Sequence, residues 1–294
     1  MPDEVEVYKS CRRFSYLPSC SLDFVILKKV FEAVKAKTEE AANIEASTLK
    51  KADNQSDEDF DKLKKYLVGL YKVTIQILGE KGDYRSSESS SIFDSNDLPD
   101  FIDSIIFDNS YKYKFQLNRD PLNKIRISFD FRRASVLDLV TSPSLPTPNE
   151  NSILVIGGNE TWVDGTYRKV LDVLEGHKNN YGWLHKRNIY DFFLIVVFAP
   201  ISFRLIYLFD RVLRNNKVNV SSVFLLFLYF YTFLITLNVF RVIFNYARWI
   251  FPNNELKTTS NKPAIHRAIL WVILLAILGT AICDIIGFAW RFLR

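Results

Sequence analysis

The stretch VSSVFLLFLYFYTFLITLNVFRVIF, residues 220–244, decides the architecture of this chain. It holds one charged residue, Arg241, in 25 positions. A helix needs about 20 apolar residues to cross roughly 30 Å of hydrocarbon. Residues 189–212 and 265–290 are similarly long and apolar. The sequence therefore predicts an all-α transmembrane bundle of about three helices over 189–294, in which Pro200 can kink or break the first helix.

The predicted spans also contain polar residues, which are costly in hydrocarbon and favour positions facing other helices or water. At 1.5 Å per residue, Arg204 and Asp284 fall at similar depths in two helices that run in the same direction, so we expect them to pair. The alternative is that both side chains extend to the membrane interface. The candidate residues for lining an ion path or for other polar contacts in the membrane are Arg204, Thr232, Thr236, Asn238 and Asp284.

Charge divides the chain at the same place as hydropathy. Residues 1–188 carry 27 Lys and Arg against 29 Asp and Glu, whereas residues 189–294 carry 11 against 4. The basic excess therefore flanks the apolar stretches, as is typical of membrane proteins, and does not indicate a nucleic-acid surface. The first 20 residues are polar and do not resemble a signal peptide. We expect a multi-pass protein of the inner (cell) membrane with residues 1–188 in the cytoplasm.

Residues 1–188 predict an α+β domain with about five mostly antiparallel strands, whose role we expect to be sensing or regulation. Helical spacing of apolar residues predicts a helix over 22–46, capped by Ser21, and a second one ending near Tyr71. A third helix is expected over 166–176. Alternating apolar residues or short apolar runs predict strands at 72–78, 105–107, 111–117, 125–131 and 153–156.

Basic residues interleave with aromatic ones on two of these predicted strands. Lys112 and Lys114 share one face of the first strand, and Arg126 lies on the next. Cations beside aromatic rings can bind phosphate and stack bases. The candidate ligand-binding residues are Lys112, Lys114, Arg126, Arg132 and Arg133. The alternative is that the aromatic side chains form the core and the charges are the solvated face of the same strands.

Enzymatic signatures are missing from the sequence: it has no phosphate-binding Gly-Lys loop, no G-x-S-x-G and no H-E-x-x-H or C-x-x-C motif. We therefore expect neither an enzyme nor a metal or cofactor site. Trp162 and Trp183 bracket the segment that joins the predicted sheet to the membrane. Both are expected to be packing anchors, and they are candidates for coupling the two regions.

Several phrases resemble a widespread group of uncharacterised bacterial membrane proteins. They are PTPNENS (146–152), GGNETWV (157–163), WLHKRNIYDFFL (183–194), SIFDSNDLPDFIDSIIFD (91–108) and ISFDF (127–131). The resemblance covers about 91–212 and says little about activity, and the third span departs from that pattern. A cytosolic sensor followed by a few helices also resembles, in architecture alone, the membrane effectors of bacterial anti-phage systems such as the Hailong type.

The architectural resemblance implies an oligomeric ion channel or pore, gated by a nucleotide or oligonucleotide that a partner enzyme makes and that binds the cytosolic domain. Such a channel needs several copies of the chain, because three helices cannot enclose a wide pore. The alternative function is a membrane-anchored scaffold or sensor that recruits partners through its soluble domain.

Overall fold

A computed structural model describes residues 10–137, 143–215, 221–257, 265–272 and 275. The chain forms two compact units. We call residues 1–132, 148–182 and 253–259 the sheet domain, and residues 133–147, 183–252 and 260–294 the helical region. The sheet domain thus includes a short segment that follows the long apolar helices in sequence.

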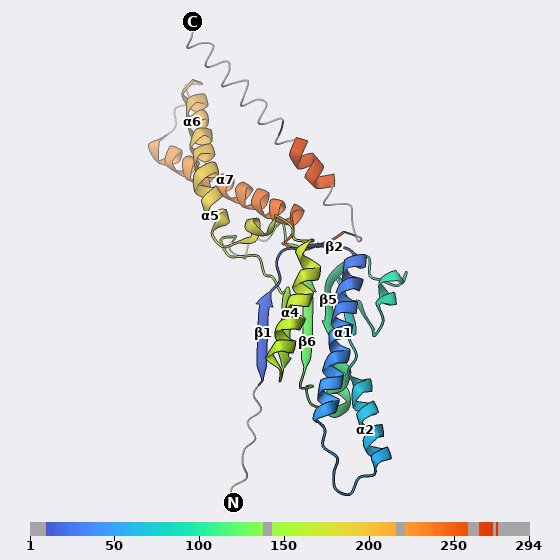
Figure 1. The fold of residues 1–294 in the computed structure, drawn as a ribbon. Coiled ribbons are helices and arrows are strands. Elements are labelled where there is room, and N and C mark those ends of the chain that lie inside the picture. The colour runs from blue at the N-terminus through green and yellow to red at the C-terminus, as the bar shows by residue number, and fades with distance from the viewer. Residues whose placement is uncertain (1–9, 138–142, 216–220, 258–264, 273–274, 276–294) are drawn as a thin grey trace, which may run out of the picture. The chain divides into compact units, whose positions relative to one another are not determined.

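The sheet domain contains a six-stranded antiparallel sheet in the order β1-β7-β6-β5-β3-β4 (Figure 1). Its strands are β1 (Cys11–Tyr16), β3 (Thr74–Gly79), β4 (Tyr84–Ser87), β5 (Ile102–Asp108), β6 (Lys124–Asp130) and β7 (Ser152–Gly157). The two-residue strands β2 (Ser21–Leu22) and β8 (Glu255–Leu256) pair in parallel. The predicted α+β class is confirmed. The sequence analysis missed the edge strands β1 and β4, which are mostly polar and exposed.

Four α-helices accompany the sheet: α1 (Phe24–Thr48), α2 (Asp57–Leu70), α3 (Tyr111–Leu117) and α4 (Glu160–Glu175). A short 3₁₀ turn, η1 (Ser90–Asp94), lies in the serine-rich loop. The N-cap of α1 is Asp23, whose carboxylate accepts a 2.8 Å hydrogen bond from the Ile26 amide, and not the predicted Ser21, which lies in β2. The third helix begins at Glu160, six residues before its predicted start, because Asn159 caps it through the Trp162 amide.

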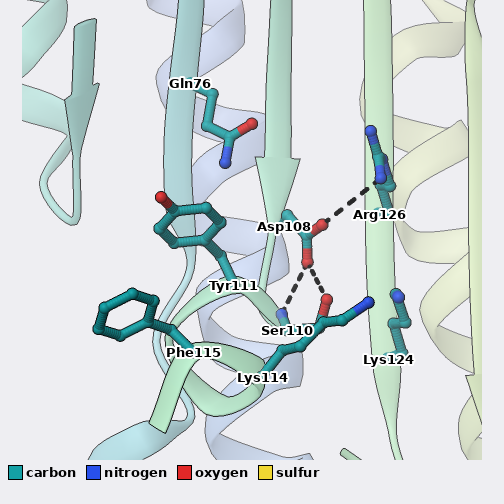
Figure 2. Close-up of a pocket in the computed structure, with 8 residues that line it drawn as sticks. All are labelled: Gln76, Asp108, Ser110, Tyr111, Lys114, Phe115, Lys124 and Arg126. Atoms are coloured by element: carbon teal, nitrogen blue, oxygen red, sulfur yellow. Dashed lines mark hydrogen bonds and ion pairs between the residues drawn. The ribbon is translucent and has the colours of Figure 1, made fainter. Parts of the chain in front are cut away.

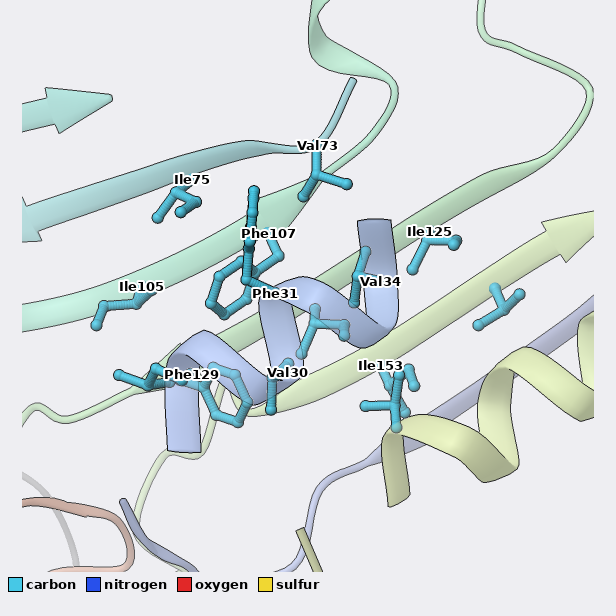
Figure 3. Packing of buried hydrophobic residues seen from close by; sticks show 14 of the residues in the cluster. Val30, Phe31, Val34, Val73, Ile75, Ile105, Phe107, Ile125, Phe129 and Ile153 are labelled. Carbon is cyan, nitrogen blue, oxygen red and sulfur yellow. The ribbon is translucent and has the colours of Figure 1, made fainter. Parts of the chain in front are cut away.

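One face of the sheet is covered by α1 and α4, and the core lies between these layers (Figures 1 and 3). Alternate strand residues such as Ile75, Phe107 and Ile153 are fully buried there, against Val30 and Val34 of α1 (Figure 3). Burial of such side chains contributes about 1.5–3 kcal/mol each, which makes this layer the main source of the domain's stability.

The predicted strand at 111–117 is wrong, because this segment is helix α3. Tyr113 is fully buried and Leu117 is partly buried, four residues apart, while Tyr111 and Phe115 are exposed. Alternate aromatic residues suggested a strand, but the spacing of the buried pair is that of a helix. As a consequence, Lys112 and Lys114 point in different directions and do not share a face.

The described part of the helical region contains two helices long and apolar enough to cross a membrane. The first runs over Ile189–Asn215 and comprises α5 (Ile189–Phe193), the π-helical segment η3 (Leu194–Phe198) and α6 (Ala199–Asn215). The second is α7 (Ser222–Ile250). In their most apolar 18-residue windows, 11% and 0% of the residues are buried, whereas a core helix of a soluble protein is mostly buried.

Pro200 does not break the first of these helices. It lies in the first turn of α6, directly after the π-helical segment. Proline has no amide hydrogen and cannot donate to the preceding turn, which is the π-helical one, and the helix continues through it. Most of the third predicted span, including Asp284, lies outside the described residues. The part of this span that is described at its start, 265–272, is helical.

Candidate functional site

The sheet face opposite α1 and α4 carries a mixed row of side chains. In register across four strands, Asp108 of β5 pairs with Arg126 of β6, which pairs with Leu154 of β7, which pairs with Phe14 of β1. Arg126 is exposed and Phe14 is 49% exposed, whereas Asp108, at the end of the row where α3 begins, is 7% exposed. Cationic and aromatic groups therefore face outward from a rigid strand framework.

A pocket of about 380 Å³ opens on this face where β5 ends and α3 begins (Figure 2). It is lined by Gln76, Asp108, Ser110, Tyr111, Lys114, Phe115, Lys124 and Arg126. Its lining comes from β3, β5, α3 and β6 and the short turn before α3. The fold thus brings together residues that are up to 50 positions apart in the sequence.

Three cations surround the pocket, and they differ in how far they are neutralised. Lys114 has no ion-pair partner among the residues described, and Arg126 lies 4.0 Å from Asp108, beyond hydrogen-bond distance. Lys124 pairs with Asp120 at 3.1 Å. The Asp108 carboxylate is itself held by Ser110, whose amide and hydroxyl donate at 2.7 and 2.6 Å. Lys114 and Arg126 are therefore the groups able to bind an added anion.

Two aromatic rings border the cations. Tyr111 is 50% exposed and Phe115 is 80% exposed, both on α3. Figure 2 shows the two rings on the Gln76 side of the pocket and the Lys114 side chain extending toward Lys124, so one small site offers both a stacking surface and a charge. The geometry suits a ligand that combines an anionic group with a planar ring.

The remaining predicted ligand residues do not join this pocket. Lys112 pairs with Glu88 at 3.3 Å. Arg132 makes two 2.9 Å hydrogen bonds to Asp130 and a further ion pair with Glu150, which together raise its pKa. Arg133 belongs to the helical region, where its guanidinium lies 5.5 Å from the ring centroid of Trp249. Of the five predicted residues, the structure brings only Lys114 and Arg126 together.

Sequence analysis missed Lys124 and the polar residues Gln76, Asp108 and Ser110. Lys124 was within reach, because it lies two positions before Arg126 on the same strand and so on the same face. The other three carry no signal in the sequence, because only the strand register and the position of α3 bring them to the pocket.

A second feature of the sheet domain is the segment after α7. Residues 253–257 return to the sheet domain and form β8 beside β2, so we call them the return segment. The Asn253 carbonyl accepts a 3.0 Å hydrogen bond from the Asn179 side chain, and its side chain bonds the Ser19 hydroxyl. Asn254 accepts from the Cys20 amide at 2.9 Å and donates to the Asp130 carbonyl at 3.2 Å.

Within the helical region, the residues before α5 are bonded to the end of α7. His185 lies 2.6 Å from the Phe251 carbonyl through Nε2 and 2.9 Å from the Thr147 hydroxyl through Nδ1. Arg248, which is 4% exposed, donates to the Leu184 carbonyl at 3.2 Å. The His185 pKa is lowered, chiefly because burial disfavours the imidazolium. This cluster joins the beginning of the first apolar helix to the end of the second.

The predicted intramembrane residues fall into two groups. Thr232 and Thr236 donate to carbonyls of their own helix, and Thr236 lies 3.5 Å from the buried Ser202 of α6, so it takes part in helix–helix packing. Arg204 and Asn238 are exposed on the surface of the two-helix pair. Near the other end, Tyr229 donates to Asp210 at 2.5 Å.

The predicted coupling residues lie in different units. Trp162 is buried at the start of α4, against Gly157, where an added Cβ would lie 2.9 Å from its ring. It is a packing residue of the sheet domain. Trp183 is 49% exposed in the helical region, and its ring lies 6.2 Å from that of Phe193.

Comparison with known proteins adds no family to this description: no family model matches the chain, and neither a curated protein nor a solved structure is significantly similar to it.

Proposed function

We propose that this chain is a membrane sensor-effector, in which the sheet domain binds a nucleotide-like ligand and the apolar helices respond as an oligomeric ion channel or pore. One observation carries the proposal. The chain leaves the sheet domain after Gly182, forms two long apolar helices with exposed surfaces, and is bonded back onto the sheet domain from Asn253. The domain with the cationic pocket is therefore joined through the chain to both ends of the apolar helix pair.

This connectivity sets the topology that we propose. If each helix crosses the bilayer once, then both Ile189 and Ile250 lie on the side of the sheet domain, and the 216–220 connection lies on the other side. Near the helix ends, the sheet-domain side carries Lys178, Lys186, Arg187, Arg248, Lys257 and Lys262, and the connection side carries Arg211, Arg214 and Lys217. Positive flanks favour the cytoplasmic side, which supports a cytoplasmic sheet domain on an inner membrane.

The ligand class follows from the pocket. Lys114, which has no ion-pair partner in the described part of the chain, and the weakly paired Arg126 favour a phosphate group. Exposed Tyr111 and Phe115 favour a base that stacks on them. We propose a nucleotide or oligonucleotide signal, made by a partner enzyme, which would suit a role in bacterial anti-phage defence.

Two described helices, or three with the predicted span over 265–290, cannot enclose a wide pore, so conduction requires a homo-oligomer. Arg204 and Asn238, which are exposed on the helix pair, are then the described candidates for contacts between copies or for the conducting path. A charged side chain in an apolar span is costly without a partner or water, which supports such a role for Arg204.

The test is ligand-dependent ion flux from liposomes containing the full chain. AMP serves as the first probe, followed by short oligoadenylates, and ribose 5-phosphate serves as the control that lacks a base. We expect binding and flux with a nucleotide, and a loss of at least about tenfold in affinity in a Lys114→Glu/Arg126→Glu variant. Lys81→Glu, in the exposed β3–β4 turn, is the matched charge control. Absence of flux with every probe would exclude the channel.

The alternative function is a membrane-anchored scaffold, which the edge strand β1 favours because its Phe14 and Tyr16 are 49% and 66% exposed. A scaffold would retain its activity when 189–250 are replaced by an unrelated helical hairpin, whereas a channel would not.

A further inference from the structure

We infer that Asn254 is a coupling residue, which links the ligand-binding strand β6 mechanically to the end of α7. This inference rests on the proposed function and assigns its route of regulation. The route runs through the return segment, and not through the connector after α4 that the sequence suggested.

The first step of the route is β6 itself. Lys124 and Arg126 line the pocket from the beginning of this strand. Asp130 ends the same strand, and its carbonyl accepts the hydrogen bond from the Asn254 amide. A paired strand is stiff, so a displacement of Arg126 by a bound anion also displaces Asp130, four residues further along β6.

The second step is the set of bonds made by Asn254. Its side chain is 3% exposed and uses both ends, donating to Asp130 and accepting from Cys20. A buried amide with both functions satisfied holds one position, because losing either partner leaves a polar group without water. Asn254 therefore joins β6 to the turn before β2.

The third step is the pairing of β8 with β2. The Glu255 amide donates to the Cys20 carbonyl at 3.0 Å, and the Lys257 amide donates to the Leu22 carbonyl at 2.8 Å. Leu256 between them is buried. These bonds hold the return segment along its length, so that it moves with the sheet domain and not independently of it.

The last step is the short link to the membrane helix. Only Phe251, Pro252 and Asn253 separate Ile250 at the end of α7 from Asn254. Proline fixes one backbone angle, and so short a segment has little slack. A displacement of Asn254 is therefore transmitted to the last turn of α7, in which the Phe251 amide donates to the Ala247 carbonyl at 2.9 Å.

The experiment measures hydrogen exchange along the full chain in lipid nanodiscs, without ligand, so that its outcome is independent of any channel activity. Asn254→Ala removes both bonds of the side chain, and Asn254→Asp keeps the acceptor for Cys20 while removing the donor to Asp130. Asn96→Ala, at an exposed loop position, is the matched control. We expect the last turn of α7 to exchange roughly tenfold faster in both Asn254 variants, about the effect of one buried hydrogen bond, and to be unchanged in the control.

A second variant separates coupling from folding. Two glycines inserted between Phe251 and Pro252 leave every bond of Asn254 in place but slacken the link. Faster exchange in the last turn of α7, with the sheet unchanged, supports the inference. Unchanged exchange at α7 in the insertion variant overturns it, even if the Asn254 variants destabilise the whole sheet domain. Loss of nucleotide-dependent flux with intact coupling would instead count against the proposed function.

Discussion

Phe107 and Phe230 are the same side chain in two opposite environments. Phe107, on β5 of the sheet domain, is fully buried, whereas Phe230, on α7 of the helical region, is 56% exposed. The contrast extends to their neighbours: Ile75, Ile105 and Ile127 are 0% exposed, and Ile235 and Ile243 are 63% and 56% exposed. The sheet domain hides its apolar surface from water within itself, whereas the described helices of the helical region leave apolar side chains exposed, as helices that could cross a bilayer do.

The largest expected effect comes from truncating the two phenylalanines. Phe107→Ala should destabilise the sheet domain by about 3–5 kcal/mol, because it removes buried contacts and leaves a cavity. Phe230→Ala should change the stability of the membrane-inserted chain by only about 0.5 kcal/mol, since its ring is replaced by lipid. Urea unfolding of the full chain in nanodiscs, followed by hydrogen exchange of β5 and α7, measures both. Equal losses would show that α7 is packed as a protein core.

A lysine placed at an exposed apolar position of each region tests whether that position faces lipid or water. Ile235→Lys, near the middle of α7, should cost about 3 kcal/mol of insertion free energy, which is more than a hundredfold in the insertion equilibrium. Leu63→Lys on α2 of the sheet domain, 40% exposed, should stay within about 0.5 kcal/mol because water already surrounds that position.

The measurement is a sidedness reporter placed at 258–264, after α7, which should move from the near side of the membrane to the far side in Ile235→Lys alone. A reporter that stays on the near side in this variant would contradict membrane insertion of α7.

The fold was predictable where the spacing of apolar residues in the sequence matches one buried or lipid-facing side of a strand or helix. Alternation over 125–131 identified β6, and a long apolar run identified α7, because burial imposes both patterns. At 111–117 the pattern was ambiguous, since seven residues fit both the two-residue repeat of a strand and the 3.6-residue repeat of a helix. The segment is a helix, in which Tyr113 packs into the core. The mostly polar strand β1 was missed because main-chain pairing with β7 forms it, and not burial of its side chains.

The candidate site was predictable only in part, for a related reason. Arg126 and Lys114 were proposed from their residue types, but Arg132 was proposed on the same grounds and is neutralised by Asp130 and Glu150. Whether a cation is available depends on neighbours from distant segments. The return segment could not be predicted from the sequence, because two-residue strands and asparagine hydrogen bonds produce no periodic pattern of apolar residues.

A smaller effect is expected at Glu45, a buried carboxylate on α1 of the sheet domain. It is 5% exposed and accepts hydrogen bonds from Tyr71, from Tyr113 at 2.6 Å and from the Leu122 amide at 3.1 Å. Burial and the bond to Glu45 raise the Tyr113 pKa to about 12. Glu45→Ala should cost about 1–3 kcal/mol, because three donors lose their acceptor.

The control for this change is Glu39→Ala, an exposed carboxylate on the same helix. Chemical unfolding followed by exchange of α1 and α3 compares the two variants. A loss at Glu39 equal to that at Glu45 would show that the buried network contributes nothing specific.

The smallest expected effect is a pH dependence of stability, which should be found in the helical region and not in the core of the sheet domain. His185 has a pKa below its ordinary value because burial disfavours the charged ring, with Arg248 acting in the same direction. A lowered pKa in the folded state means that the neutral ring is the stabilising form. Its contribution is complete above about pH 6.5, the ordinary value, and is lost as the pH falls through the folded value.

Acidification from pH 7.5 to pH 5 should therefore loosen the cluster that joins the beginning of α5 to the end of α7, while the core of the sheet domain is unaffected. Because a carbonyl can only accept, the neutral ring donates from Nε2 to Phe251 and leaves Nδ1 to accept from Thr147. Melting curves at both pH values should show a smaller acid-induced loss in His185→Gln than in the wild type or in His177→Gln. An equal loss in all three would place the acid-sensitive group elsewhere. An acid-induced loss of stability that only His185→Gln reduces would show that this junction responds to pH independently of the sheet domain.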